Sequence, residues 1–311
     1  MNMSMSDVRV VDPVLTEVSI GYRNATLVGD LLYPRVPVEL RAGKIIEFDK
    51  QAFRLVGTAR APGANVKEVP IGYEGQAFAL DQHALSGKLP REHLEEASRA
   101  PGVNLGAQSV RTVMDILLLG AEYAQAALAR DPAKYAADHV LNLTGAGQTP
   151  WSDGAKDPLS DIDEAREVIR GTIGRYPNTL LLGPMAFNAA KSSPAVIEKF
   201  KYTSSASVTA DMLAAQWNLK KVVVGEAIYT DDQGDFHDVW GADAILAYVP
   251  EGGVGKEVPS YGYTYVLRGC PFVESAIYDG KTKSWLYPVT HEYKPVMVGP
   301  GAGFLLRNVA G

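Results

Sequence analysis

Residues 175–202 decide the fold and read RYPNTLLLGPMAFNAAKSSPAVIEKFKY. The apolar run at 180–182 predicts a short strand, which Gly183 and Pro184 end. Residues 185–191 have the pattern of a short helix, and Pro194 begins a second one, because proline fits the first turn of a helix. No catalytic residue type dominates the stretch. It therefore predicts a compact unit of one strand, a sharp turn and two helices.

Composition narrows the class of protein. The chain has 311 residues, 46% of them hydrophobic, which is enough for a substantial core. Its apolar runs fall short of the roughly 18 residues that span a bilayer, and its start, MNMSMSDVRVVD, lacks the pattern of a signal peptide. A net charge of −6 argues against a dedicated nucleic-acid binder, and the lone Cys270 excludes an internal disulfide. We therefore expect synthesis in the cytoplasm, no membrane partner and only local contact with DNA.

The first ninety residues predict an arm and a projecting hairpin. Prolines 13, 34 and 37 prevent a long helix before residue 40, which favours an arm lying on neighbouring structure. Residues 44–48 and 66–69 have strand patterns, and a turn-rich segment at 57–63 separates them. A long hairpin is marginal on its own in water, so it would need another surface to lie on.

Two helices are expected next. Residues 105–130 carry apolar side chains every three or four positions, and Asp131 and Pro132 end this pattern, which predicts a helix about 39 Å long. A second helix is expected to run to residue 175, with Ser160 or Asp161 as its N-cap and Asp163 or Glu164 completing a capping box.

Strands and helices alternate in the last part of the chain. Residues 208–219 predict a helix, and residues 221–228 and 244–249 predict buried strands, so that 177–269 form one mixed unit. Further strands follow from residue 270, and the glycines at 299, 301 and 303 predict a turn before the last one.

None of the possible chemical motifs is convincing, so we predict no catalytic, cofactor-binding or metal-binding residues. In GGVGK at 252–256, Glu257 stands where a phosphate-binding loop needs Ser or Thr, and Pro250 stands where it needs its first glycine. His237 lies between Asp235 and Asp238, which could make a metal site, although a solvated loop explains the spacing better. No nucleophile elbow is present, and the acidic pairs fit helix starts and solvated faces.

The opening stretch resembles the core of the major capsid proteins of tailed bacteriophages, where a strand ending in Leu-Gly-Pro precedes a helix and a hydrophobic-basic segment ending near Lys-Tyr. More pieces of the resemblance follow in order along the chain: DPVL at 12–15, PRVPV at 34–38, VVVGEA at 222–227, VWGAD at 239–243 and PSYGYT at 259–264. Each piece is short, but the ordered set covers most of the chain.

The resemblance implies an α+β protein with the Hong Kong 97 type capsid fold. Its parts would be an N-terminal arm (1–40), an extended β-hairpin loop (41–90), a peripheral domain (91–176) with the long spine helix 105–130, an axial domain (177–269) and strands returning to the peripheral domain (270–311). Side chains of the extended loop would then contact neighbouring subunits, rather than form an ordinary exposed hairpin, and the candidates are Lys44, Ile46, Phe48, Arg54 and Lys67.

The function implied is structural, not enzymatic. Such a major capsid, or head, subunit assembles with itself as pentamers and hexamers into an icosahedral procapsid, which expands as double-stranded DNA is packaged without sequence-specific binding. The expected partners are a separate scaffolding protein, a portal and decoration proteins. The protein would be assembled in the host cytoplasm and reside in the virion.

Two alternatives come from other classes. An encapsulin-like shell would share the fold but enclose protein cargo. A soluble α/β hydrolase or binding protein would stay a small oligomer and be stabilised by its ligand. The missing catalytic motifs count against the second alternative.

Overall fold

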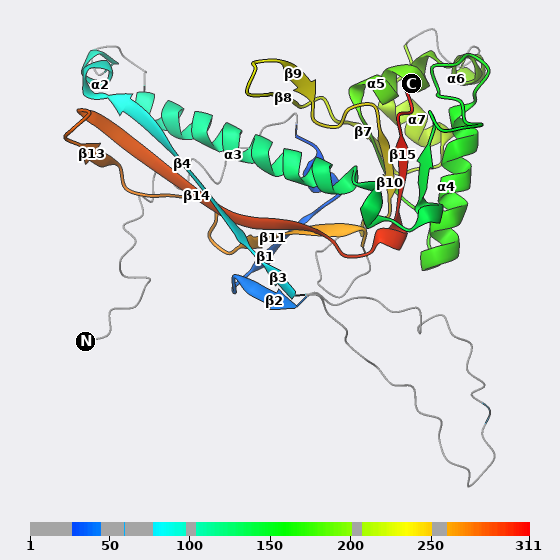
Figure 1. Cartoon of the computed structure of the whole chain (residues 1–311), viewed down its shortest axis with the longest axis horizontal. Coiled ribbons are helices and arrows are strands. Elements are labelled where there is room, and N and C mark those ends of the chain that lie inside the picture. The colour runs from blue at the N-terminus through cyan, green and yellow to red at the C-terminus, as the bar shows by residue number, and fades with distance from the viewer. Residues whose placement is uncertain (1–26, 45–58, 60–76, 98–103, 201–206, 251–259) are drawn as a thin grey trace.

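In this computed structural model, a six-stranded and a five-stranded β-sheet are joined by one long helix, and two two-stranded sheets complete the described strands (Figure 1). It describes residues 27–44, 59, 77–97, 104–200, 207–250 and 260–311. The larger sheet lies along the long axis beneath the helix, and the smaller sheet stands at one end with most of the short helices around it (Figure 1).

The larger sheet is built around one long strand, β14 (Ser284–Met297). Its order is β1 (Arg35–Val38), β11 (Gly262–Leu267), β14 and β12 (Phe272–Val273), and β4 (Asp81–Pro90) and β13 (Ile277–Asp279) also pair with β14. The β1 strand runs parallel to β11, whereas the other pairs are antiparallel.

Helix α3 (Leu105–Ala129) confirms the predicted long helix. Asn104 caps its start by accepting a hydrogen bond from the amide of Ala107, at 3.0 Å. Its apolar stripe, which includes Val110 and Met114, packs on Val273 and Val289 of the larger sheet. By length and composition α3 could also cross a membrane, but half of its apolar window is buried inside the protein, as expected for a core helix.

The smaller sheet contains the strand predicted by the opening stretch. Its order is β5 (Val140–Asn142), β15 (Gly303–Arg307), β10 (Ala244–Ala247), β6 (Thr179–Leu182) and β7 (Lys221–Val224). Both faces are covered, which explains why residues 180–182 are continuously apolar. Leu180 and Leu182 face a core that includes Trp151 and Trp217, whereas Leu181 faces a second core next to α3.

The helices around this sheet are α4 (Pro158–Ile173), α5 (Pro184–Ser192), α6 (Pro194–Phe200) and α7 (Ala210–Gln216). The two helices expected after Gly183 are confirmed. The N-cap expected for α4 is wrong, because Asp157 caps it and Pro158 occupies its first position. The helix expected at 208–219 is shorter at both ends, and the strand expected at 221–228 stops at residue 224.

Gly183 explains the Leu-Gly-Pro motif. A Cβ atom at this position would lie 1.8 Å from the carbonyl oxygen of Gly241 and 3.0 Å from that of Trp240. These are backbone atoms, which cannot turn aside as a flexible side chain could. The turn between β6 and α5 can therefore approach residues 240 and 241 only if residue 183 has no side chain.

Two more pairs of strands form small two-stranded sheets. Strands β2 (Ala42–Lys44) and β3 (Ala77–Ala79) are antiparallel, so the chain leaves and returns side by side at the base of the predicted extended loop. Strands β8 (Ile228–Thr230) and β9 (Phe236–Asp238) form the second pair, a hairpin. A short helix, α2 (Arg91–Ala97), follows β4 at the far end of the larger sheet (Figure 1).

The predicted segments do not coincide with single structural units. Residues 81–90, at the end of the predicted loop, pair with β14 in the larger sheet. Strand β1, which belongs to the predicted arm, pairs with β11 of the same sheet. The predicted returning segment 270–311 contributes β14 to the larger sheet and β15 to the smaller one. The five domain boundaries stay predictions.

Candidate functional site at the junction of the two sheets

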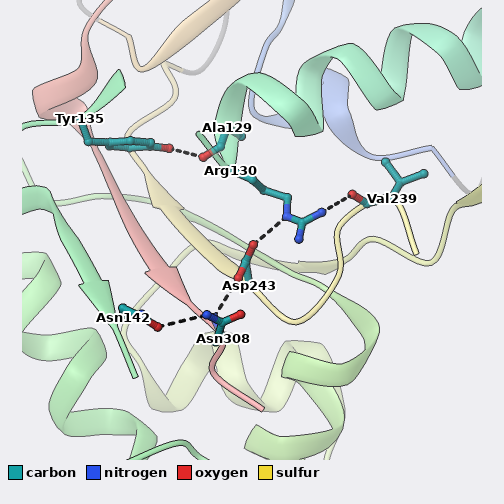
Figure 2. Close-up of polar contacts among 7 residues, drawn as sticks. All are labelled: Ala129, Arg130, Tyr135, Asn142, Val239, Asp243 and Asn308. Carbon is teal, nitrogen blue, oxygen red and sulfur yellow. Dashed lines mark hydrogen bonds and ion pairs between the residues drawn. The ribbon is translucent and has the colours of Figure 1, made fainter. Parts of the chain in front are cut away.

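An ion pair joins the end of α3 to the smaller sheet (Figure 2). Arg130 directly follows the helix, and its Nε lies 2.7 Å from Oδ2 of Asp243, just before β10. Its Nη1 donates to the carbonyl oxygen of Val239, at 3.0 Å. The Asp243 side chain is 6% exposed and the Arg130 side chain 34%. Since Asp243 would be buried without an ionic partner if Arg130 were removed, this pair fixes how α3 meets β10.

The same carboxylate also holds the segment after β15. Its Oδ1 accepts a hydrogen bond from the backbone amide of Asn308, at 2.8 Å. The Asn308 side chain donates to Oδ1 of Asn142, at 3.1 Å (Figure 2). Asn308 has φ of 51°, and asparagine tolerates this left-handed conformation better than most residues. Asp243 therefore connects α3, β10 and the C-terminal segment.

The turn before Asp243 requires a glycine. Gly241 has φ of 57°, and a Cβ atom there would lie 2.6 Å from Nη2 of Arg130. The left-handed backbone conformation therefore favours glycine at residue 241, and any side chain there would also displace the guanidinium of Arg130.

A buried carboxylate, Glu122 of α3, makes a second connection. It accepts hydrogen bonds from the amides of Val28 and Gly29, at 3.0 and 2.7 Å, and from Nε1 of Trp240, at 2.7 Å. Glu122 is only 2% exposed, and burial raises the pKa of its carboxyl group. Three segments far apart in sequence therefore meet at one side chain. One helical turn further on, Gln125 donates to Asp30 and Thr264, at 3.1 and 2.9 Å.

Three buried tyrosines complete the junction. The hydroxyl of Tyr135 donates to the carbonyl oxygen of Ala129 at the end of α3, at 2.6 Å, and is hydrogen-bonded to the hydroxyl of Tyr261. Tyr33 donates to the same Tyr261 hydroxyl, at 3.2 Å. Burial raises the pKa of Tyr261 well above its ordinary value, so the phenol stays neutral. The cluster is therefore a directional polar contact inside an apolar core.

Of the residues predicted as subunit contacts, the structure describes only Lys44, which lies away from this junction. Lys44 is exposed at the end of β2, opposite Ala77 of β3. The other four, Ile46, Phe48, Arg54 and Lys67, lie outside the described residues, as does the glycine-rich loop 252–256. His237 pairs with Asp231, at 2.9 Å, and the described residues contain no group of three or more His, Cys, Asp and Glu that could hold a metal ion.

Sequence reasoning missed the junction because it followed only apolar side chains along α3. Glu122 and Gln125 lie on the same face as Leu118 and Ala129, at spacings of four, three and four residues. Two polar side chains on an otherwise apolar helical face are a recognisable signal, because such groups are seldom buried without partners.

Comparisons with known proteins identify the family. A family model described as phage major capsid protein E matches residues 133–259. The major capsid protein of Burkholderia phage BcepMu is 37% identical over 312 residues, which cover 99% of this chain and 99% of that protein. The chain belongs to the phage major capsid proteins.

Solved structures agree with this assignment. The capsid protein is 44% identical to a phage-related protein from Bordetella bronchiseptica RB50, with a TM-score of 0.82 over 97% of this chain and 98% of that one. The fold is also shared with the capsid of cyanophage P-SCSP1u, at 10% identity and a TM-score of 0.57, covering 99% of this chain and 92% of that one. An encapsulin from Synechococcus elongatus PCC 7942 is 12% identical, with a TM-score of 0.51 over 92% and 88% of the two chains. The predicted α+β fold of Hong Kong 97 type is thus confirmed.

Proposed function

We propose that this capsid protein assembles with copies of itself, as pentamers and hexamers, into an icosahedral shell that encloses packaged double-stranded DNA. The full-length identity to the capsid protein of phage BcepMu carries this proposal. The protein would act by assembly, not catalysis. It would be assembled in the host cytoplasm and reside in the virion, and its further partners would be a scaffolding protein, a portal and decoration proteins.

The exposed apolar side chains support assembly. Leu40 and Phe236 are 73% and 72% exposed, and Ile116, Ile228 and Ile277 are each at least half exposed. Single apolar residues on a surface are ordinary, but a shell subunit has neighbours that can cover several such sites at once.

The experiment is light scattering with negative-stain electron microscopy on the purified chain, at several salt concentrations and with or without a candidate scaffold. Closed shells, or rings with five- and six-fold symmetry, are expected. A monomer or small dimer under every condition would contradict the proposal. Particles filled with protein cargo would favour the encapsulin-like alternative, whose support is a shared fold at 12% identity.

We also propose Lys44, Ile46, Phe48, Arg54 and Lys67 as contacts with neighbouring subunits. Lys44 is the member that can be tested on a described position, because its side chain is exposed at the end of β2. Lys44→Glu should lower the yield of shells. Lys134→Glu is the matched control, since it makes the same charge change on an exposed residue of another segment. Equal losses in both variants would attribute the effect to net charge alone.

A further inference from the structure

The β8–β9 hairpin has two unlike faces. Its register pairs Ile228 with Asp238, Tyr229 with His237, and Thr230 with Phe236. Directly paired residues in an antiparallel hairpin share a face, and successive pairs alternate between faces. Tyr229 and His237 therefore lie on one face, and Ile228 and Phe236 lie on the other.

The first face is attached to the chain itself. The ring of Tyr229 meets Tyr123 of α3 edge-on, with 5.0 Å between centroids and 71° between planes. The ring of His237 lies 5.4 Å from that of Tyr229, and its Nε2 lies 2.9 Å from Oδ2 of Asp231. These contacts hold the first face of the hairpin against α3, so its second face points away from α3.

The second face is apolar and uncovered within this chain. Phe236 is 72% exposed and Ile228 is 50% exposed. The residues around them are acidic, since 230–238 read TDDQGDFHD and contain neither lysine nor arginine. The hydrogen bond from His237 lowers the pKa of Asp231, which keeps that carboxylate charged. A partner for this face would therefore match it with a mixed hollow, in which apolar side chains contact Phe236 and Ile228 and positive charge lies beside them.

Such a surface lies on the opposite long side of the molecule, at β2 and β3 (Figure 1). A cavity of about 370 Å³ there is lined by residues that include Leu40, Lys44, Phe78 and Arg268. Leu40 is 73% exposed, and Phe78 is held by stacking on Tyr265 at 4.6 Å. The lining has two cations, Lys44 and Arg268, and one carboxylate, Glu39.

The Glu39 carboxylate leaves this charge available to a partner. It pairs with Arg268 at 3.0 Å, but the two side chains are 73% and 70% exposed, so the pair is weak. An incoming carboxylate could therefore share the Arg268 guanidinium at little cost.

We propose that the β8–β9 hairpin of one subunit docks at the β2–β3 surface of a second copy of this chain. Phe236 would enter the cavity beside Leu40, and the aspartates of the hairpin would face Lys44 and Arg268. Two different patches on opposite sides make a head-to-tail contact, which closes into a ring when repeated with the correct rotation. This inference rests on the proposed function, because it names a contact within the proposed pentamers and hexamers.

The first test is charge reversal with rescue. Asp232→Lys and Arg268→Glu should each lower the yield of rings and shells at least tenfold, and the double variant should recover most of it. Asp138→Lys is the control, because it changes the charge in the same way at an exposed residue of another segment. Circular dichroism on each soluble subunit would confirm that the variants fold.

The second test is a disulfide across the contact, in a Cys270→Ser background that assembles like the wild type. The double variant Phe236→Cys with Leu40→Cys should give a ladder of linked chains on oxidation, and either cysteine alone should not.

The outcomes separate this inference from the proposed function. If the wild-type chain forms no rings or shells, the proposed function is contradicted. If it assembles, and so do both charge variants without any ladder, only the docking of the hairpin is overturned. Loss of assembly without rescue and without a ladder would also overturn it.

Discussion

Replacing Glu122 with glutamine tests whether the buried carboxylate holds the junction together. Its two oxygens accept three hydrogen bonds: Oε1 from Val28 and Trp240, and Oε2 from Gly29. Glutamine has only one oxygen, so its NH₂ group must face at least one of these donors. The least costly arrangement leaves the Gly29 amide buried without an acceptor. We expect a loss of about 2–3 kcal/mol in the free energy of unfolding.

Two assays measure this loss. Thermal unfolding of the unassembled subunit should show Tm lowered by about 3–5 °C. Hydrogen exchange should be faster at the Gly29 amide by roughly 30- to 150-fold, because each factor of ten corresponds to about 1.4 kcal/mol. Glu164→Gln, the same change on the exposed face of α4, is the control and should alter neither value. Unchanged Tm and unchanged exchange at Gly29 in Glu122→Gln would refute the reasoning.

The stability difference between the wild type and Glu122→Gln should also depend on pH. Burial raises the pKa of Glu122 in the folded chain. A raised folded pKa gives a contribution to stability that is fully present below the ordinary glutamate pKa and is lost as the pH rises through the folded value. The stability difference between the wild type and Glu122→Gln should therefore narrow as the pH rises from about 4 to 7. A stability difference that widens over this range would mean that the three hydrogen-bond donors lower the pKa of Glu122 by more than burial raises it.

Three other changes have outcomes that follow from single contacts. Gly183→Ala should lower the free energy of unfolding by about 3 kcal/mol or prevent folding, because its Cβ atom would clash with a backbone oxygen. The control Gly171→Ala in α4, where nothing lies within 4 Å of the added Cβ atom, should raise it by about 0.5–1 kcal/mol, and denaturant unfolding measures both. Asp243→Ala should lower the free energy of unfolding by about 2–3 kcal/mol in the same assay, because it removes the ion pair of a partly exposed Arg130 and leaves the Asn308 amide without its acceptor. Burial lowers the pKa of His291 to about 3. The free energy of unfolding, measured at several pH values, should therefore fall by up to about 2 kcal/mol between pH 7 and 5, and His291→Phe should reduce this fall.

Local signals predicted the elements that depend on local chemistry. The strand at 180–182 was recognisable because both faces of the smaller sheet are buried, and Gly183 and Pro184 marked its end. Helix α3 was recognisable because one of its faces packs on the larger sheet. The start of α4 was misplaced because Ser160 or Asp161 was expected to cap it, although Asp157 followed by Pro158 is a cap with proline at the first helical position.

Pairings between distant segments could not be predicted in the same way. Strand β1 pairs with β11, so that Arg35 lies opposite Thr264, and nothing in either four- to six-residue strand specifies the other. Such pairing depends on the whole path of the chain. The junction was missed for a related reason: Glu122 is one polar residue in a helix, and its role exists only where Gly29 and Trp240 meet it.

Polar contacts at the junction give the subunit a defined shape that apolar packing alone would specify less well. The core between the two sheets is largely apolar, and apolar contacts tolerate small rotations because they have no preferred direction. Glu122 and Asp243 accept hydrogen bonds from fixed backbone amides, which do have a direction. Each carboxylate also accepts a hydrogen bond from a side chain on the other side of the junction: Glu122 of α3 from Trp240, and Asp243 beside β10 from Arg130. A rotation of one sheet against the other would break bonds at both carboxylates together. The orientation of one sheet relative to the other is therefore fixed by directional hydrogen bonds to two buried carboxylates, and not by apolar packing alone.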